Sequence, residues 1–207
     1  MKAYTGTVAR NYERDRVKEA IWHMEQLYMR NLVSSWPRGA SVLDVPVGSG
    51  RFLPIYREFG IEATGIDASP EMLAAARKKD ERAALFTGNA EQINLPAKSV
   101  DYAVCWRLAH LVPPESLARI IPELMRVTRQ RAIIQFFSLR RKKSALRSVL
   151  GPLVASLRGE PWAHIPNYEH ETVDVERAIC GAGANINRVE LLPDRRYMPT
   201  VYVVACD

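Results

Sequence analysis

The 207-residue sequence lacks the features that mark disulfide-rich, metal-binding and membrane-spanning proteins. Its three cysteines, Cys105, Cys180 and Cys206, are far apart and odd in number. No close pair of His or Cys residues has the spacing of metal ligands, so no metal site is predicted. No apolar run is long enough to cross a bilayer, and the first residues show no signal-peptide pattern. We therefore expect a protein of the reducing cytoplasm.

What the chain does contain is enough apolar sequence for a full core. Hydrophobic residues make up 47% and charged residues 25% of the chain, without an internal repeat or a low-complexity tract. This composition predicts one domain over residues 1–207. The net charge of +6 favours an anionic partner but does not name one.

The most informative stretch is a small-residue turn within residues 41–50. An apolar run over residues 42–45 predicts a strand, and residues 51–59 have the spacing of an amphipathic helix. Gly48 and Gly50 in the turn allow the backbone to approach a ligand, because neither residue carries a Cβ. The helix start offers free N–H groups to an anionic or nucleotide ligand. A tight turn without a ligand is the alternative.

Two further polar turns follow predicted strands. Asp67 ends an apolar strand about 20 residues after the glycine turn, the spacing used to hold two ribose hydroxyls. It could instead only cap the helix that begins with Ser69 and Pro70. The strand over residues 83–87 leads to the polar turn 88–92, which could read an adenine edge or simply be exposed to solvent.

In this order, the three segments resemble the class I S-adenosylmethionine (SAM)-dependent methyltransferases, in particular their small-molecule group. Residues 44–50 resemble the family's acid-x-Gly-x-Gly-x-Gly motif, with Pro46 in the place of the first glycine. Residues 65–73 and 89–91 resemble its second and third motifs. The resemblance covers roughly residues 40–138 well and the C-terminal end loosely.

The resemblance implies an α/β fold in three α-β-α layers. The expected sheet has seven mostly parallel strands, of which the last is antiparallel. SAM is the implied cofactor and S-adenosylhomocysteine (SAH) its product. The implied cofactor-binding residues are Asp44, Pro46, Gly48, Gly50, Asp67, Ala68, Met72, Asn89, Ala90, Glu91 and Trp106.

The expected reaction is methyl transfer to an O or N atom of a small or medium-sized acceptor. Trp106, Arg107 and His110 follow the strand predicted over residues 99–105, and ligands of open α/β sheets lie outside such strand ends. We therefore predict that Arg107 and His110 bind the acceptor and that His110 is the catalytic base. In the alternative interpretation His110 only orders its loop.

Two segments outside the motifs are predicted to shape the acceptor site. Residues 8–35 have helical spacing in Val17, Ile21, Met24, Tyr28 and Leu32, and residues 1–38 are the predicted N-terminal cap. A plain packing helix is the alternative. In the related enzymes such a segment lies over the cofactor. On that resemblance, the predicted acceptor-binding residues of this cap are Tyr4, Tyr12 and Arg16.

Residues 139–171 are predicted to be a lid inserted between the fifth strand and the last helix. A basic cluster over residues 140–147 precedes apolar residues at helical spacing. Trp162 and His164 follow and are predicted to bind the acceptor. A basic lid with an apolar face suits an acceptor with an anionic group. A solvated charge run and attachment to an anionic membrane surface are alternatives, whereas nucleic acid is not expected because aromatics do not alternate with the basic residues.

Two other functions remain open at this point. In a nicotinamide-dependent oxidoreductase, Leu53 would stand where the dinucleotide fingerprint has a third Gly or Ala. A SAM-binding partner subunit without turnover would account for Pro46 and for the atypical connection over residues 128–131. The chain is predicted to end in a helix over residues 173–180 and strands over residues 186–191 and 197–205.

Overall fold

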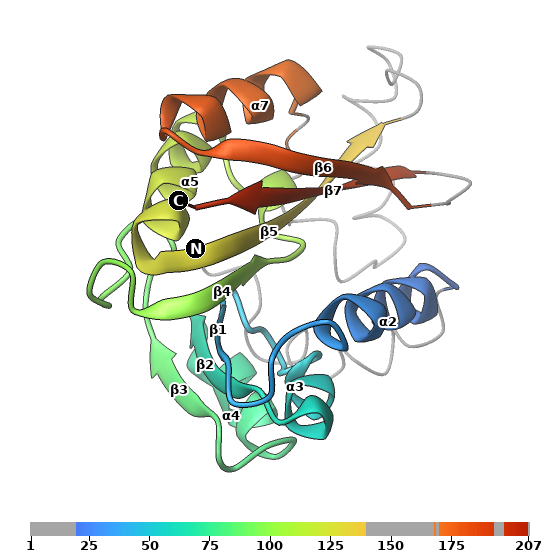
Figure 1. Cartoon of the computed structure of the whole chain (residues 1–207), viewed down its shortest axis with the longest axis vertical. Coiled ribbons are helices and arrows are strands. Elements are labelled where there is room, and N and C mark those ends of the chain that lie inside the picture. The colour runs from blue at the N-terminus through green and yellow to red at the C-terminus, as the bar shows by residue number, and fades with distance from the viewer. Residues whose placement is uncertain (1–19, 140–167, 169, 193–196, 207) are drawn as a thin grey trace, which may run out of the picture.

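The computed structural model describes residues 20–139, 168, 170–192 and 197–206. Their strands form one seven-stranded sheet in the order β3-β2-β1-β4-β5-β7-β6 (Figure 1). Neighbouring strands from β3 to β5 are parallel, whereas β7 is antiparallel to both β5 and β6. The strands are β1 (Ser41–Asp44), β2 (Glu62–Asp67), β3 (Ala84–Thr87), β4 (Val100–Cys105), β5 (Thr128–Leu139), β6 (Asn185–Leu191) and β7 (Tyr197–Ala205).

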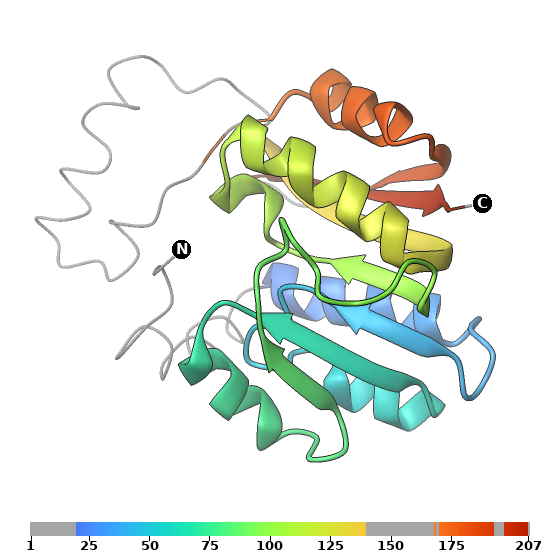
Figure 2. The ribbon, with the colours of Figure 1, turned by 90° about the vertical axis from the view of Figure 1, so that its left-hand side faces the viewer.

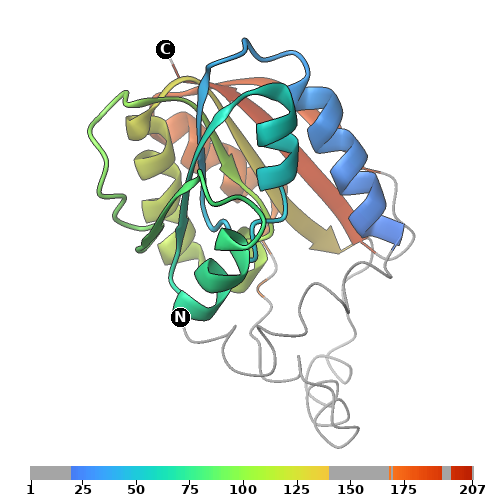
Figure 3. The same cartoon turned by 90° about the horizontal axis from the view of Figure 1, so that it is seen from below.

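Helices cover both faces of this sheet, so the predicted three-layer architecture is confirmed. The sheet lies between α2 with α3 on one side and α5 with α7 on the other (Figures 2 and 3). Alternate strand residues point to the two cores: Val42 packs with α2 and α3, and Leu43 packs with α5 and α7. The helices are α2 (Ala20–Val33), α3 (Leu53–Phe59), α4 (Pro70–Arg77), η1 (Ala109–Leu111), α5 (Pro114–Val127) and α7 (Thr172–Gly181).

The buried face of α2 differs from the predicted one. Its fully buried residues are Trp22, Glu25, Met29 and Val33. The predicted stripe was offset by one residue along the helix, and its members Met24, Tyr28 and Leu32 are only partly buried. The prediction followed apolar residues alone, and it therefore missed that a glutamate occupies the centre of the buried face.

The connection from α5 to β5 is tighter than expected. The helix continues through the exposed Pro122 to Val127, and the strand begins at the next residue, Thr128. The Thr128 hydroxyl donates a hydrogen bond to the Leu124 carbonyl at 2.6 Å. The strand therefore already includes residues 128–131, which were predicted to form an atypical connection, because the helix leads into it without a turn.

Three further observations concern the cysteines, the lengths of the helices, and the predicted cap and lid. Cys105 and Cys206 are buried, whereas Cys180 is exposed. Among the described residues, none of the helices combines the length and apolar composition that a bilayer crossing requires. The described part of the predicted cap is α2, while residues 1–19 and most of the predicted lid lie outside the described residues.

Candidate functional site

A cavity of about 270 Å³ lies at the carboxyl ends of β1, β2 and β4. This is the edge of an open α/β sheet at which ligands bind. Every predicted cofactor-binding residue except Gly50 lines the cavity, and so does Arg107. Segments that are up to 60 residues apart in the motifs thus meet around one space. The residues that meet there are Asp44, Pro46, Gly48, Asp67, Ala68, Met72, Asn89, Ala90, Glu91, Trp106 and Arg107.

The two glycines of the turn have different roles. Gly48 has a φ of +55° and lines the cavity, where an added Cβ would meet only Met72 Cε at 3.6 Å. Gly50 has a φ of +73°, and its Cβ would lie 2.7 Å from Leu53 Cδ1 and 2.9 Å from Ala76 Cα. Gly50 therefore permits the turn before α3 to lie close to Ala76 of α4 rather than the approach of a ligand.

Asp67 connects the glycine turn to the start of α4. Its Oδ2 accepts a hydrogen bond from the Gly48 N–H at 2.9 Å, and its Oδ1 accepts one from the Ser69 N–H at 2.8 Å. Burial raises the pKa of Asp67, and hydrogen bonds from backbone N–H groups counteract this rise. Because each carboxylate oxygen has two lone pairs, both can accept a further hydrogen bond from a ligand.

The helix that follows has its own cap, so Asp67 does more than cap it. The Ser69 hydroxyl accepts a hydrogen bond from the Met72 N–H at 3.3 Å, as an N-cap residue does. Met72, one turn into α4, is buried and lines the cavity. This places an apolar thioether side chain beside the carboxylate of Asp67.

Asp44 ends β1 in a drier environment than Asp67. Its side chain is almost fully buried, and the Tyr56 hydroxyl donates to its Oδ2 at 3.4 Å. Burial raises the pKa of Asp44 to about 8, although the Tyr56 hydrogen bond lowers it in part. Burial thus favours the protonated form of the Asp44 carboxyl relative to an exposed aspartate.

Pro46 stands beside this carboxyl in the turn. It lines the cavity, and the Val45–Pro46 peptide bond is cis. Proline has no N–H, so the turn presents one donor fewer than a glycine at this position would.

The third turn is held in shape by its own polar groups. Asn89 Oδ1 accepts a hydrogen bond from the Glu91 N–H at 3.0 Å, and the Asp67 carbonyl accepts one from the Gly88 N–H at 3.0 Å. Glu91 forms an ion pair with Arg119 at 2.6 Å, and this contact lowers the pKa of Glu91. The Asn89 side chain is exposed, so the alternative of a solvent-facing turn holds for part of this segment.

The opposite end of the cavity contains a buried ion cluster that the sequence analysis missed. Glu25 of α2 has no exposed surface and accepts hydrogen bonds from Arg51 Nη1 at 2.7 Å and Arg107 Nε at 3.1 Å. Arg51 Nη2 also donates to the Trp22 carbonyl at 2.9 Å. Both arginines line the cavity. The sequence signal that could have indicated this cluster was a charged residue, Glu25, on the buried face of an otherwise amphipathic helix.

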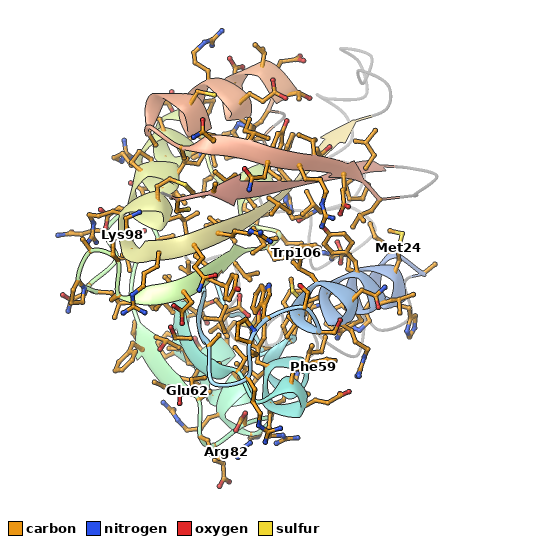
Figure 4. All side chains as sticks on the ribbon, in the orientation of Figure 1. Met24, Phe59, Glu62, Arg82, Lys98 and Trp106 are labelled. Carbon is orange, nitrogen blue, oxygen red and sulfur yellow. The ribbon has the colours of Figure 1, made fainter. Side chains whose placement is uncertain are left out.

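Aromatic rings complete this end of the wall. Trp106 lies between the sheet and α2 (Figure 4), with its ring centre 5.6 Å from Phe52 and 5.9 Å from Tyr28. The Arg51 guanidinium lies 3.9 Å from the Trp22 ring centre, a cation–π contact. Apolar rings and buried charges thus surround the part of the cavity that follows β4.

Two buried polar atoms of cavity residues are left without partners. Trp106 Nε1 and Ser49 Oγ make no hydrogen bond within the part of the chain that the structure describes. Buried polar groups are normally paired, so unpaired ones beside a cavity fit a site that receives a polar ligand. An adenosyl amino acid has a flat aromatic base and the polar groups that such a wall can bind.

The structure describes only some of the predicted acceptor-binding residues. His110 lies in η1 after β4, outside the cavity lining, and its carbonyl accepts a hydrogen bond from the Tyr168 N–H at 2.8 Å. His170 Nε2 holds the same loop, at 2.7 Å from the Ala109 carbonyl and 3.0 Å from that of Val112. The role of His110 as a base stays a prediction. Tyr4, Tyr12, Arg16, Trp162 and His164 lie outside the described residues.

Comparison with known proteins agrees with this geometry. Residues 42–131 match a family model described as a methyltransferase domain. A malonyl-[acyl-carrier protein] O-methyltransferase of Pectobacterium atrosepticum is 35% identical over 101 residues, which are 49% of this chain and 39% of that protein. A phosphatidylethanolamine N-methyltransferase of Cereibacter sphaeroides is 39% identical over 100 residues, 45% and 47% of the two chains. The matches thus span less than half the length of these relatives.

The likeness to solved structures extends over nearly the whole chain. The crystal structure of magnesium protoporphyrin IX methyltransferase from Synechocystis PCC 6803 with bound SAH superposes with a TM-score of 0.70. It is 18% identical, and the superposition covers 98% of this chain and 96% of that chain. Residues 42–131 therefore match the methyltransferase-domain family model, and the chain has the Rossmann-like fold seen in solved structures of SAM-dependent methyltransferases.

Proposed function

We propose that this chain binds SAM and transfers its methyl group to an O or N atom of a small or medium-sized acceptor. The observation that carries the proposal is Asp67, whose carboxylate is held by the N–H groups of Gly48 and Ser69 at the edge of the cavity. A carboxylate fixed in this way can accept hydrogen bonds from two neighbouring ribose hydroxyls. The related proteins are named as an O-methyltransferase and an N-methyltransferase, which supports either atom as the acceptor.

In this proposal, different cavity residues bind different parts of SAM. Asp67 holds the ribose, while Met72 and the turn of Asn89 to Glu91 flank the adenine. Gly48 lets the methionyl part approach the backbone. Trp106 and Arg107, which follow β4, lie toward the acceptor.

Methyl transfer mainly requires the protein to align the acceptor atom with the methyl group and the sulfur. When bound, SAM supplies the methyl group and the sulfur leaving group. The chain's own residues hold the acceptor atom in line with them and exclude water, which is the main source of rate enhancement in such a displacement. A base is needed only where the acceptor must lose a proton, so the position of His110 outside the cavity lining is compatible with methyl transfer.

The acceptor reaches this site between the N-terminal cap and the lid in our proposal. The chain is then one domain over residues 1–207, with the cap over residues 1–38 and the lid over residues 139–171. Arg107, buried in the wall after β4, supports an acceptor with an anionic group.

A SAM-binding subunit without turnover is the second candidate. Pro46 in the turn favours it, because the missing N–H removes one donor beside the ligand. Nicotinamide binding is less well supported. Leu53 is fully buried where the dinucleotide fingerprint has a small residue, and an antiparallel β7 lies between β5 and β6.

Calorimetric titration with SAM, SAH and NAD separates these functions. We expect 1:1 binding of SAM and SAH and no binding of NAD. With an acceptor library, we also expect release of SAH at more than one equivalent per chain. Stoichiometric SAM binding without SAH release on any acceptor would favour the silent subunit, and binding of NAD alone would contradict the proposal.

A further inference from the structure

The ion cluster poses an electrostatic problem for the proposed ligand. Arg51 and Arg107 are each 9% exposed and line the cavity. SAM carries a fixed positive charge on its sulfonium sulfur, and like charges repel most strongly where water is excluded. Two buried arginines alone would therefore oppose the sulfonium charge of this cofactor.

Glu25 supplies a negative charge beside both arginines. Its Oε2 lies 2.7 Å from Arg51 Nη1 and 2.9 Å from Arg107 Nη2. The carboxylate has no exposed surface, so solvent screens its field little. It reaches the arginines from α2, behind the cavity wall, and does not itself line the cavity.

The acidic residues of the cavity lining lie elsewhere. Asp44 lies at the end of β1, where the Tyr56 hydroxyl donates to its Oδ2 at 3.4 Å and burial raises its pKa to about 8. Asp67 accepts backbone hydrogen bonds at the β2 end. Glu91 is paired with Arg119 on the third turn. Among the described residues, Glu25 is thus the carboxylate that pairs with both arginines at this end of the site.

We propose that Glu25 is a charge-balancing residue of the cofactor site: its buried carboxylate offsets Arg51 and Arg107, so that the cavity accepts a sulfonium cation. This inference rests on the proposed function. The charge of Glu25 affects SAM and SAH differently, because the sulfur of SAH is neutral while the rest of the molecule, apart from the methyl group, is the same. Glu25 therefore acts on the preference for SAM over SAH, which a purely structural role would leave unchanged.

The test is the ratio of the SAM and SAH dissociation constants in a Glu25→Gln variant. Glutamine keeps the shape of the side chain and removes its charge. We expect the ratio of the SAM to the SAH dissociation constant to rise about tenfold, the effect of one charge at roughly 10 Å with an effective dielectric constant of about 20. Calorimetry gives both constants without turnover.

A matched control uses an exposed ion pair between α2 and α3. Arg30 of α2 pairs with Glu58 of α3, and both side chains are about half exposed. Glu58→Gln makes the same substitution away from the cavity, so we expect the SAM/SAH ratio to stay at the wild-type value.

Two further variants keep the proposal testable if Glu25→Gln does not fold. Arg107→Gln removes a positive charge and should move the ratio in the opposite direction, toward SAM. The double variant Glu25→Gln/Arg107→Gln removes one charge of each sign and should return the ratio close to that of the wild type. An unchanged ratio in Arg107→Gln would then overturn the proposal by itself.

The outcomes separate this inference from the proposed function. Equal weakening of SAM and SAH in Glu25→Gln would mean that Glu25 only docks α2, and the charge-balancing role would be wrong although the chain still binds SAM. Failure of the wild-type chain to bind either compound would overturn both proposals together.

Discussion

The two ends of the cavity are built in different ways. At the β2 and β3 end, short-range backbone contacts hold the polar groups: Asp67 accepts from Ser69, two residues away, and Asn89 accepts from Glu91. At the β4 end, side-chain ion pairs join Glu25 to Arg51 and Arg107, which are 26 and 82 residues away in the chain. The first end depends on turn geometry, whereas the second depends on the docking of α2.

Of the changes in the turns around the cavity, substitution of Gly50 is expected to have the largest effect on stability. Gly50→Ala should lower the free energy of unfolding by about 2–4 kcal/mol, through left-handed strain and overpacking together. The physical reason is that the new Cβ would lie 2.9 Å from the Ala76 Cα, a backbone atom that cannot move alone. Urea denaturation measures the change.

Gly39→Ala is the matched control for this prediction. Gly39 also has a positive φ, +84°, but a Cβ there would meet no atom within 4 Å. We expect strain alone, a loss of about 1–2 kcal/mol. Equal losses in the two variants would show that the close approach of this turn to Ala76 of α4 does not require Gly50.

Asp44, on β1 between the two ends, gives a smaller and pH-dependent effect. Its folded-state pKa of about 8 is above the ordinary value of 3.8, so the unfolded chain loses the proton first as the pH rises. The stability of the wild type should therefore fall, relative to Asp44→Asn, by about 2 kcal/mol between about pH 5 and pH 7. Urea unfolding of both proteins across this range measures the difference.

Asp101 at the start of β4 provides a control of opposite sign. Hydrogen bonds from Ser41, first from its backbone N–H, lower the pKa of Asp101. The contribution of Asp101 to stability should be present above its ordinary pKa and be lost as the pH falls through the lowered pKa.

A pH-independent difference in stability between wild type and Asp44→Asn would mean that Asp44 is solvated in the folded protein.

The parts of the site that the sequence predicted are those encoded within a few residues. The glycine turn, Asp67 and the turn at Asn89 each follow a strand, and parallel strands bring their ends to one edge. The antiparallel β7 could be predicted because the chain ends in two strands joined by a short turn. Gly50 shows the limit of this reasoning, since its neighbour Ala76 lies in another helix.

The arginine end could not be predicted in the same way. Glu25 looks like an ordinary polar residue of an amphipathic helix until the rotation of α2 on the sheet is known. Arg51 was treated as the start of a helix, although it pairs with Glu25. Long-range ion pairs leave no periodic pattern in a sequence, so only the packed structure brings them together.

The most direct test of the account is the titration of SAH into the wild-type chain and the Asp67→Ala variant. The account predicts a 1:1 complex for the wild type and a loss of about a hundredfold in affinity for the variant, because two charge-assisted hydrogen bonds to the ribose disappear. If the variant binds SAH as tightly as the wild type, Asp67 does not hold a nucleoside and the proposed site is wrong.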